Sequence, residues 1–156
     1  HHTSVRFALL SVRQDPLAPY IEKLKDTSSR DWYENVQIIK LVGANAGAAI
    51  PNLIAALATT NNLNNSLIQA HACEALGLIH SRPEVCVPAL TSLLKATDAD
   101  VRAAAVWALT RFGSEAKPAW DELSECLKDG HRWTREAAAR LLKQINPGAA
   151  AKAGVQ

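Results

Sequence analysis

Metal binding or covalent catalysis would have to come from a small number of histidines and cysteines in this 156-residue sequence. A metal site could be sought at His71, Cys73 and His80. On a helix, residues two apart point about 200° from each other, so His71 and Cys73 would not bind the same ion. The three cysteines, Cys73, Cys86 and Cys126, form no CxxC pair, so neither a thiolate zinc site nor a disulfide framework is indicated. We therefore expect reduced, buried thiols and no metal ligands.

The sequence motifs of common catalytic sites are also absent. The chain has no Gly-x-Ser-x-Gly nucleophile turn, no phosphate-binding loop and no dinucleotide-binding glycine pattern. We therefore predict a protein that is not an enzyme, with no catalytic residues and no cofactor.

The composition favours closely packed helices. Apolar residues make up 48% of the chain and aromatic residues only 5%, so the core must consist mainly of Ala, Leu, Val and Ile. The net charge of +2 is too small to indicate a nucleic-acid or membrane partner. Residues 41–73 lack Asp, Glu, Lys and Arg, but Pro51 and the Asn-rich tract at 61–65 interrupt this segment before about 20 apolar residues accumulate. We do not expect it to span a membrane.

An internal repeat determines the expected fold. Apolar residues recur at intervals of 37, 33 and 33, and within each unit they lie three and four residues apart, as on one face of a helix. The clearest column of the second helix contains Ile39, Leu76, Leu109 and Leu142. A column of the first helix contains Leu53, Leu90 and Leu123.

Prolines indicate where the first helices begin. Pro51, Pro88 and Pro118 fall near the expected starts, where a missing N–H costs least. The one longer interval predicts an exposed Asn-rich loop at 61–65. The predicted helix pairs are 16–25 with 30–42, 47–58 with 66–80, 84–96 with 99–112, and 115–128 with 131–145.

The third unit carries a family resemblance. Residues 100–113, DVRAAAVWALTRFG, resemble the second-helix signature of short HEAT repeats, the type also found in phycobilisome (PBS) lyases, and GSEAKP at 113–118 resembles the entry to the next unit. Tetratricopeptide repeats have a similar period, but the Asp-x-Val-Arg turn fits HEAT repeats better. The resemblance covers residues 16–147, and the tail after Asn146 resembles the C-termini of bacterial HEAT-repeat proteins.

This resemblance implies an all-α fold, a right-handed α-α superhelix of the HEAT-like or armadillo type with about four helix pairs. We expect one domain over residues 3–147, with repeats at 16–43, 47–80, 84–113 and 115–146. We interpret residues 1–2 as the remnant of a purification tag, so that the native N-terminus is missing. Residues 148–156 are predicted to be a flexible tail.

In this family the second helices line the concave side. One of their columns contains Gln37, Glu74, Trp107 and Arg140, which implies a solvent-facing row. With neighbours one turn away, the predicted partner-binding residues are Tyr33, Gln37, Glu74, Trp107, Arg111, Arg140 and Lys143. Trp107 is either a binding hot spot or a structural residue that covers Ala-rich helices and stacks on Arg140, and the sequence leaves both interpretations open.

Two further sets of residues are expected to be structural. Arg102 and Arg135 recur one repeat apart, and the resemblance implies that such an arginine pairs with an aspartate of an adjoining turn, with Asp98 and Asp100 as candidates. Trp120 occupies an apolar column and is predicted to lie in the core.

The resemblance implies a scaffold that binds a protein or peptide on its concave face, with contacts between copies through the solenoid ends as an open option. The sequence leaves the cellular location open, with the cytoplasm favoured. Nucleic-acid binding, as in HEAT-like DNA glycosylases, is an alternative that six acidic residues between 115 and 136 oppose. It would use Arg102, Arg111, Arg132, Arg135, Arg140 and Lys143. Bilin lyase chemistry rests on fold analogy only, and the His-Glu dipeptides of HEAT-like di-iron hydroxylases are absent.

Overall fold

The computed structural model describes residues 16–60 and 64–156. Within these ranges the chain forms helices and no strand. The elements, with 3-10 helices marked η, are α2 (Ala18–Lys23), α3 (Trp32–Val42), η1 (Gly43–Ala49), α4 (Ile50–Leu57), α5 (Asn65–Ile79), α6 (Pro83–Thr91), α7 (Ala99–Phe112), η2 (Gly113–Ala119), α8 (Trp120–Glu125), η3 (Cys126–Lys128), α9 (Arg132–Ile145) and α10 (Pro147–Lys152). Residues 1–15, which include the expected tag remnant, and residues 61–63 of the expected Asn-rich loop lie outside the described residues.

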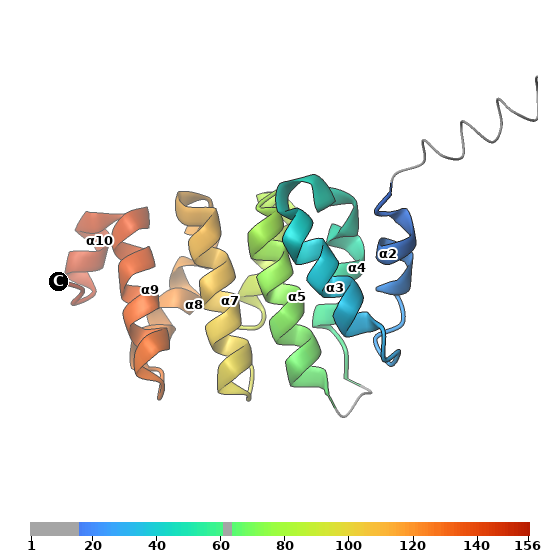
Figure 1. Ribbon diagram of the computed structural model, residues 1–156. Coiled ribbons are helices and arrows are strands. Elements are labelled where there is room, and N and C mark those ends of the chain that lie inside the picture. The colour runs from blue at the N-terminus through green and yellow to red at the C-terminus, as the bar shows by residue number, and fades with distance from the viewer. Residues whose placement is uncertain (1–15, 61–63) are drawn as a thin grey trace, which may run out of the picture.

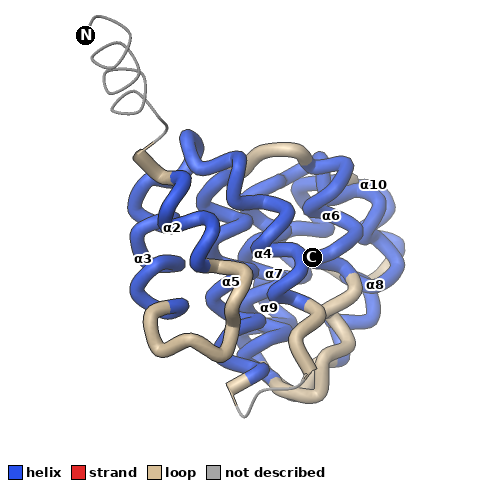
Figure 2. The backbone as a smooth tube through the Cα atoms, turned by 90° about the vertical axis from the view of Figure 1, so that its right-hand side faces the viewer, coloured by secondary structure: helices blue, strands red, loops and turns tan. Residues whose placement is uncertain are grey.

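The described helices stack as four consecutive pairs in two layers. The second helices α3, α5, α7 and α9 lie side by side across the front of Figure 1, and each contacts the next. The view along the stack in Figure 2 separates α3 and α5 on one side from α6 and α8 on the other. This arrangement confirms the predicted all-α solenoid. We call the surface formed by α3, α5, α7 and α9 the second-helix face.

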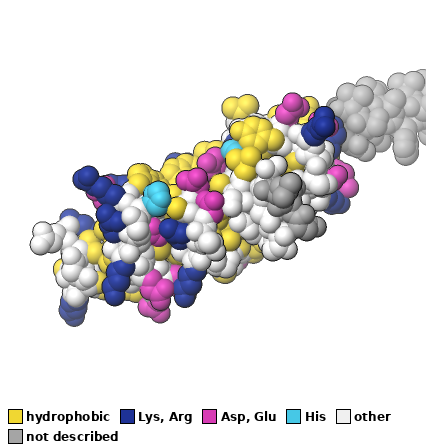
Figure 3. Space-filling view, turned by 90° about the horizontal axis from the view of Figure 1, so that it is seen from below, with side chains coloured by type: hydrophobic (Ala, Val, Ile, Leu, Met, Phe, Trp, Pro, Cys, Tyr) yellow, Lys and Arg dark blue, Asp and Glu magenta, His cyan; other side chains and the backbone are white. Residues whose placement is uncertain are grey.

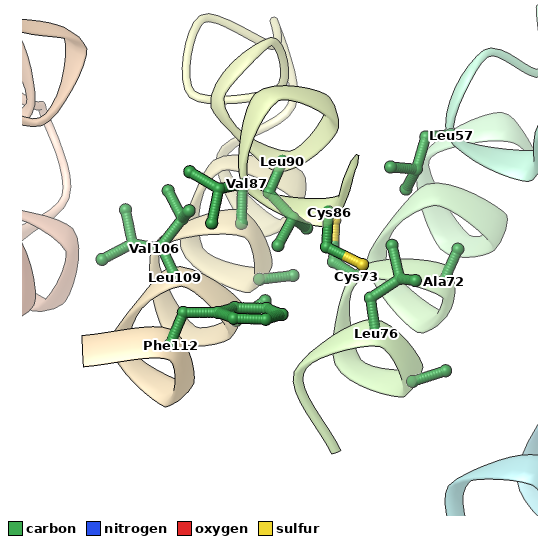
Figure 4. Close-up of a cluster of buried hydrophobic side chains, with 14 of the residues drawn as sticks. Leu57, Ala72, Cys73, Leu76, Cys86, Val87, Leu90, Val106, Leu109 and Phe112 are labelled. Carbon is green, nitrogen blue, oxygen red and sulfur yellow. The ribbon is translucent and has the colours of Figure 1, made fainter. Parts of the chain in front are cut away.

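The repeating apolar columns form the core between the layers. Ile39, Leu76, Leu109 and Leu142 are fully buried, as are Leu53, Leu90 and Leu123 of the first helices. Figure 4 shows such side chains converging from α5, α6 and α7. Alanines at the same level of α5, α7 and α9 are also fully buried, so neighbouring helices approach closely: Ala72, Ala105 and Ala138.

The chain changes direction at a glycine at two junctions between repeats, and between α5 and α6 it does so at His80 and Arg82, which have positive φ. Gly43 and Gly113 follow α3 and α7 with φ of 64° and 59° and ψ of −124° and −129°, a region that is readily accessible only to glycine. Residues Trp32–Leu57 are long and apolar enough to pass as a membrane span by length and composition. However, the segment consists of α3, η1 and α4, interrupted at Gly43, and its Ile39 and Leu53 lie in the core.

One repeated position makes the same kind of hydrogen bond in all four repeats, although its residue type varies. It is occupied by Trp32, Gln69, Arg102 and Arg135, at intervals of 37, 33 and 33. Each side chain donates a hydrogen bond to a backbone carbonyl at the end of the preceding first helix or in the turn that follows it: Trp32 to Leu24 (3.1 Å), Gln69 to Leu57 (3.0 Å), Arg102 to Ala96 (2.9 Å) and Arg135 to Asp129 (2.7 Å). These bonds satisfy carbonyls that a helix end leaves without a partner.

Arg102 also makes an ion pair, but with a different aspartate from the two candidates. Its guanidinium contacts Asp129, in the turn of the following repeat. The Asp98 carboxylate instead caps α7, accepting hydrogen bonds from the amides of Asp100 (2.8 Å) and Val101 (3.3 Å). The expectation that Arg102 pairs with an aspartate of an adjoining turn is therefore confirmed, whereas both candidates, Asp98 and Asp100, were wrong.

Two local expectations differ from the structure. Pro88 lies inside α6, which begins at Pro83. Pro88 is exposed, and so is Glu84, whose carbonyl loses its helical partner because Pro88 has no N–H. The tail expected to be flexible instead forms α10, because Asn146 Oδ1 caps it by accepting from Ala149 N (3.1 Å), Pro147 occupies its first turn, and Ala150 is fully buried.

Candidate functional site

The second-helix face contains an open groove between α5 and α7 that extends to the start of α9. Its volume is about 550 Å³, within the range of small-molecule sites. The lining residues are Ala70, Glu74 and Leu78 of α5, Asp100, Ala103, Ala104 and Trp107 of α7, and Trp133 of α9.

Helical spacing explains why these side chains meet. Residues 100, 103, 104 and 107 are three, four and seven apart and so share one face of α7, as residues 70, 74 and 78 do on α5. Ala103 and Ala104 leave space between the larger side chains around them. Trp107 and Trp133 therefore rise above a floor of small residues.

Trp107 is seated against α5 through a glycine. A Cβ atom at Gly77 would lie 2.9 Å from Cζ3 of Trp107 and 3.1 Å from Cα of Ala108. Only a residue without a side chain allows this close approach. The indole is half-buried and packs against the core, while part of it lines the groove. Trp107 therefore has a structural contact as well as an accessible surface.

A polar cluster adjoins the groove at Glu74. Lys40 Nζ lies 2.6 Å from Glu74 Oε2 and 2.6 Å from His71 Nδ1, and the Lys40 side chain is only 10% exposed. Burial, and then the Lys40 charge, lower the pKa of His71, although Glu74 acts in the opposite direction. The edge of the His71 ring meets the exposed ring of Tyr33, with centroids 4.7 Å apart. A neutral His71 accepts from Lys40 and completes this cluster.

The structure brings only some of the expected site residues together. Glu74 and Trp107 line the groove, and Tyr33 is connected to Glu74 through His71 and Lys40. Gln37 is half-buried on α3.

The three remaining basic residues are exposed on α7 and α9 and are not among the residues that line the groove: Arg111, Arg140 and Lys143. Figure 3 shows most of the visible Lys and Arg side chains toward the C-terminal end, whereas acidic side chains are spread along the molecule.

Sequence reasoning missed Trp133 and Asp100 as site residues. It selected the single polar column that contains Glu74 and Trp107. A groove lies between two such columns, and residues of both columns line it. Trp133 and Asp100 occupy the same position of successive repeats, 33 residues apart. Alanines at 70 and 103, beside larger residues at 74 and 107, were the available signal for a hollow.

The described residues offer little for covalent or metal chemistry. The three cysteines are free and buried, and burial raises the pKa of Cys73 to about 12 and those of Cys86 and Cys126 to about 11. Such thiols are poor nucleophiles near neutral pH. Within residues 16–60 and 64–156, no group of three His, Cys, Asp or Glu side chains could hold a metal ion.

Stacked antiparallel helix pairs with a continuous core define an α-solenoid. The family model of HEAT repeats matches residues 50–143, which is more than half of the chain. The chain belongs to the HEAT-repeat family. HEAT repeats generally mediate protein–protein interaction, and the family is generally a non-catalytic scaffold. No curated protein matches the sequence.

Proposed function

We propose that this chain is a non-catalytic scaffold that binds a peptide segment of a partner protein on its second-helix face. The observation that supports this proposal is the groove with Trp107 and Trp133 on its walls. Tryptophan is among the residues that most often dominate interface energies. The groove would be the centre of the interface, with Tyr33, Gln37, Arg111, Arg140 and Lys143 contributing around it.

The groove is suited to this role because its walls are held in place before binding. Trp107 rests on Gly77, and α7 is fixed between α5 and α9 by a fully buried core. A peptide would therefore order itself without requiring the protein to reorganise, which limits the entropic cost of association.

Selection from a phage library of random dodecapeptides tests the proposal. We expect the wild-type protein to enrich peptides that no longer bind after Trp133→Ala, a variant that removes a 44% exposed side chain. Tyr20→Ala, which removes an exposed aromatic ring on α2, is the matched control and should retain binding. Peptides that bind Trp133→Ala as well as the wild type would refute the proposed site.

Nucleic-acid binding has less support. Of the basic residues that it would use, Arg102 is paired with Asp129, Arg132 with Glu136, and Arg135 donates to a backbone carbonyl. These contacts compete with phosphate groups. Titration with labelled duplex DNA at low salt would detect this activity if it exists, because phosphate contacts are strongest there.

A further inference from the structure

We propose that the groove selects a basic residue, Arg or Lys, of the partner peptide. Its aliphatic stem would lie on Trp107 and the alanine floor, and its charged group would face Asp100. The inference rests on the proposed function and adds the chemical class of the anchoring residue.

The proposal is based on the negative charge of the groove. The ionisable side chains that line it are Glu74 and Asp100, and both are acidic. Glu74 is already paired with Lys40 at 2.6 Å. The Asp100 carboxylate has no ion-pair partner within the described part of the chain and is exposed. The groove therefore presents one carboxylate without an ion-pair partner, in the first turn of α7, together with two indole rings.

Two arginines close in sequence to Asp100 and Trp133 are engaged elsewhere. Arg102, two residues along α7, directs its guanidinium to Asp129 at 2.8 Å and to the carbonyls of Ala96 and Thr97. Arg132, next to Trp133, pairs with Glu136 at 2.7 Å. Neither arginine is free to neutralise Asp100 unless it gives up these contacts.

An arginine or lysine fits this combination better than other side chains. The face of an indole attracts a cation, and the methylene stem of Arg or Lys packs on apolar surface while its charge stays near water. An acidic residue would meet Asp100 as a like charge. A purely apolar residue would cover Asp100 and leave its carboxylate without a partner, which is costly.

The test uses peptides selected by the wild-type protein from the random dodecapeptide library, resynthesised with each basic residue replaced by glutamine. We expect one Arg or Lys to recur, and its replacement to weaken binding about fivefold. Asp100→Asn should reduce that difference between the basic and the glutamine peptide, while the attraction of the cation to Trp107 remains. Asp121→Asn, which changes an exposed aspartate in the first turn of α8, should preserve it.

The possible failures can be distinguished. Selected peptides that need Trp133 but carry no recurring basic residue would overturn the inference and leave the proposed function intact. An undiminished preference for Arg or Lys in Asp100→Asn would do the same. Peptides that do not need Trp133 would overturn both. A dimer of the free protein that dissociates on Trp133→Ala would assign the groove to a second copy of this chain, which also overturns the inference.

Discussion

Arg102 Nε lies 2.8 Å from Asp129 Oδ2, and this pair joins the second helix of the third repeat to the turn of the fourth. Arg102 Nη2 adds a longer contact to the other carboxylate oxygen at 3.3 Å. Asp129 also accepts from His131 N at 2.9 Å, and its side chain is only 7% exposed. Asp129 thus holds the third repeat through Arg102 and stabilises its own turn through the amide of His131.

Replacing Asp129 should therefore destabilise the fold. Asp129→Ala removes hydrogen bonds from a charged partner, so we expect the free energy of unfolding to fall by about 1.5–3 kcal/mol. Chemical denaturation followed by circular dichroism measures this change. Asp121→Ala removes an exposed carboxylate and is the control. An equal effect of both substitutions would show that the Arg102 pair contributes no special stability.

Gly77 should not tolerate a side chain. Its Cβ would come within 3.1 Å of the Ala108 backbone and 2.9 Å of the Trp107 ring, so Gly77→Ala must separate α5 from α7. We expect a loss of about 1–3 kcal/mol and a change in tryptophan fluorescence. At Gly47 a Cβ would meet nothing within 4 Å, so Gly47→Ala should be neutral or stabilising. If both variants melt alike, Trp107 is not seated as described.

Thr134 should be improved by an apolar replacement. Its hydroxyl is fully buried and has no hydrogen-bond partner among the described residues, while the same position holds Ile68 and Val101 in earlier repeats. Thr134→Val keeps the shape and removes the unsatisfied group, so we expect stabilisation by about 1 kcal/mol.

Thr110→Val is the comparison for Thr134→Val, because Thr110 is an exposed residue whose hydroxyl donates to Val106 O at 2.9 Å. Its effect should lie within about 0.5 kcal/mol. A thermal melt in which Thr134→Val loses stability would indicate that the hydroxyl has a partner.

Stability should decrease on acidification partly because of His71. Its pKa in the folded protein lies below the ordinary value of 6.5, so below that pH the unfolded chain binds a proton that the folded chain does not. Stability is therefore lost as the pH falls from about 6.5 toward the folded pKa.

The contribution of His71 can be isolated by substitution. His71→Asn should flatten the dependence of the unfolding free energy on pH between about pH 7.5 and 5.5. An unchanged slope in His71→Asn would contradict the lowered pKa that burial and then Lys40 give His71.

The helix pairs were predictable from sequence because helical periodicity repeats whenever a stack buries the same face. Leu76 and Leu109, at equivalent positions of successive repeats, mark that face. The partner of Arg102 was not predictable, because it lies 27 residues away and depends on how one repeat stacks on the next.

Residue type concealed other relationships. Trp32 and Gln69 differ from Arg102, yet all three are N–H donors to a carbonyl near the end of a first helix. The groove was missed in part because Trp133 contributes from a different column than Trp107. Columns that group similar residue types did not reveal these relationships, because residues of different type play the same structural role.

The most direct test of the proposed binding site is a ¹H–¹⁵N spectrum of the four tryptophan indoles during titration with a library-selected peptide. Trp107 and Trp133 line the groove, Trp32 is buried in the first pair, and Trp120 lies in the layer of first helices. A peptide in the groove should shift the Trp107 and Trp133 resonances and leave those of Trp32 and Trp120 in place. Saturating peptide that shifts neither Trp107 nor Trp133 would contradict the account.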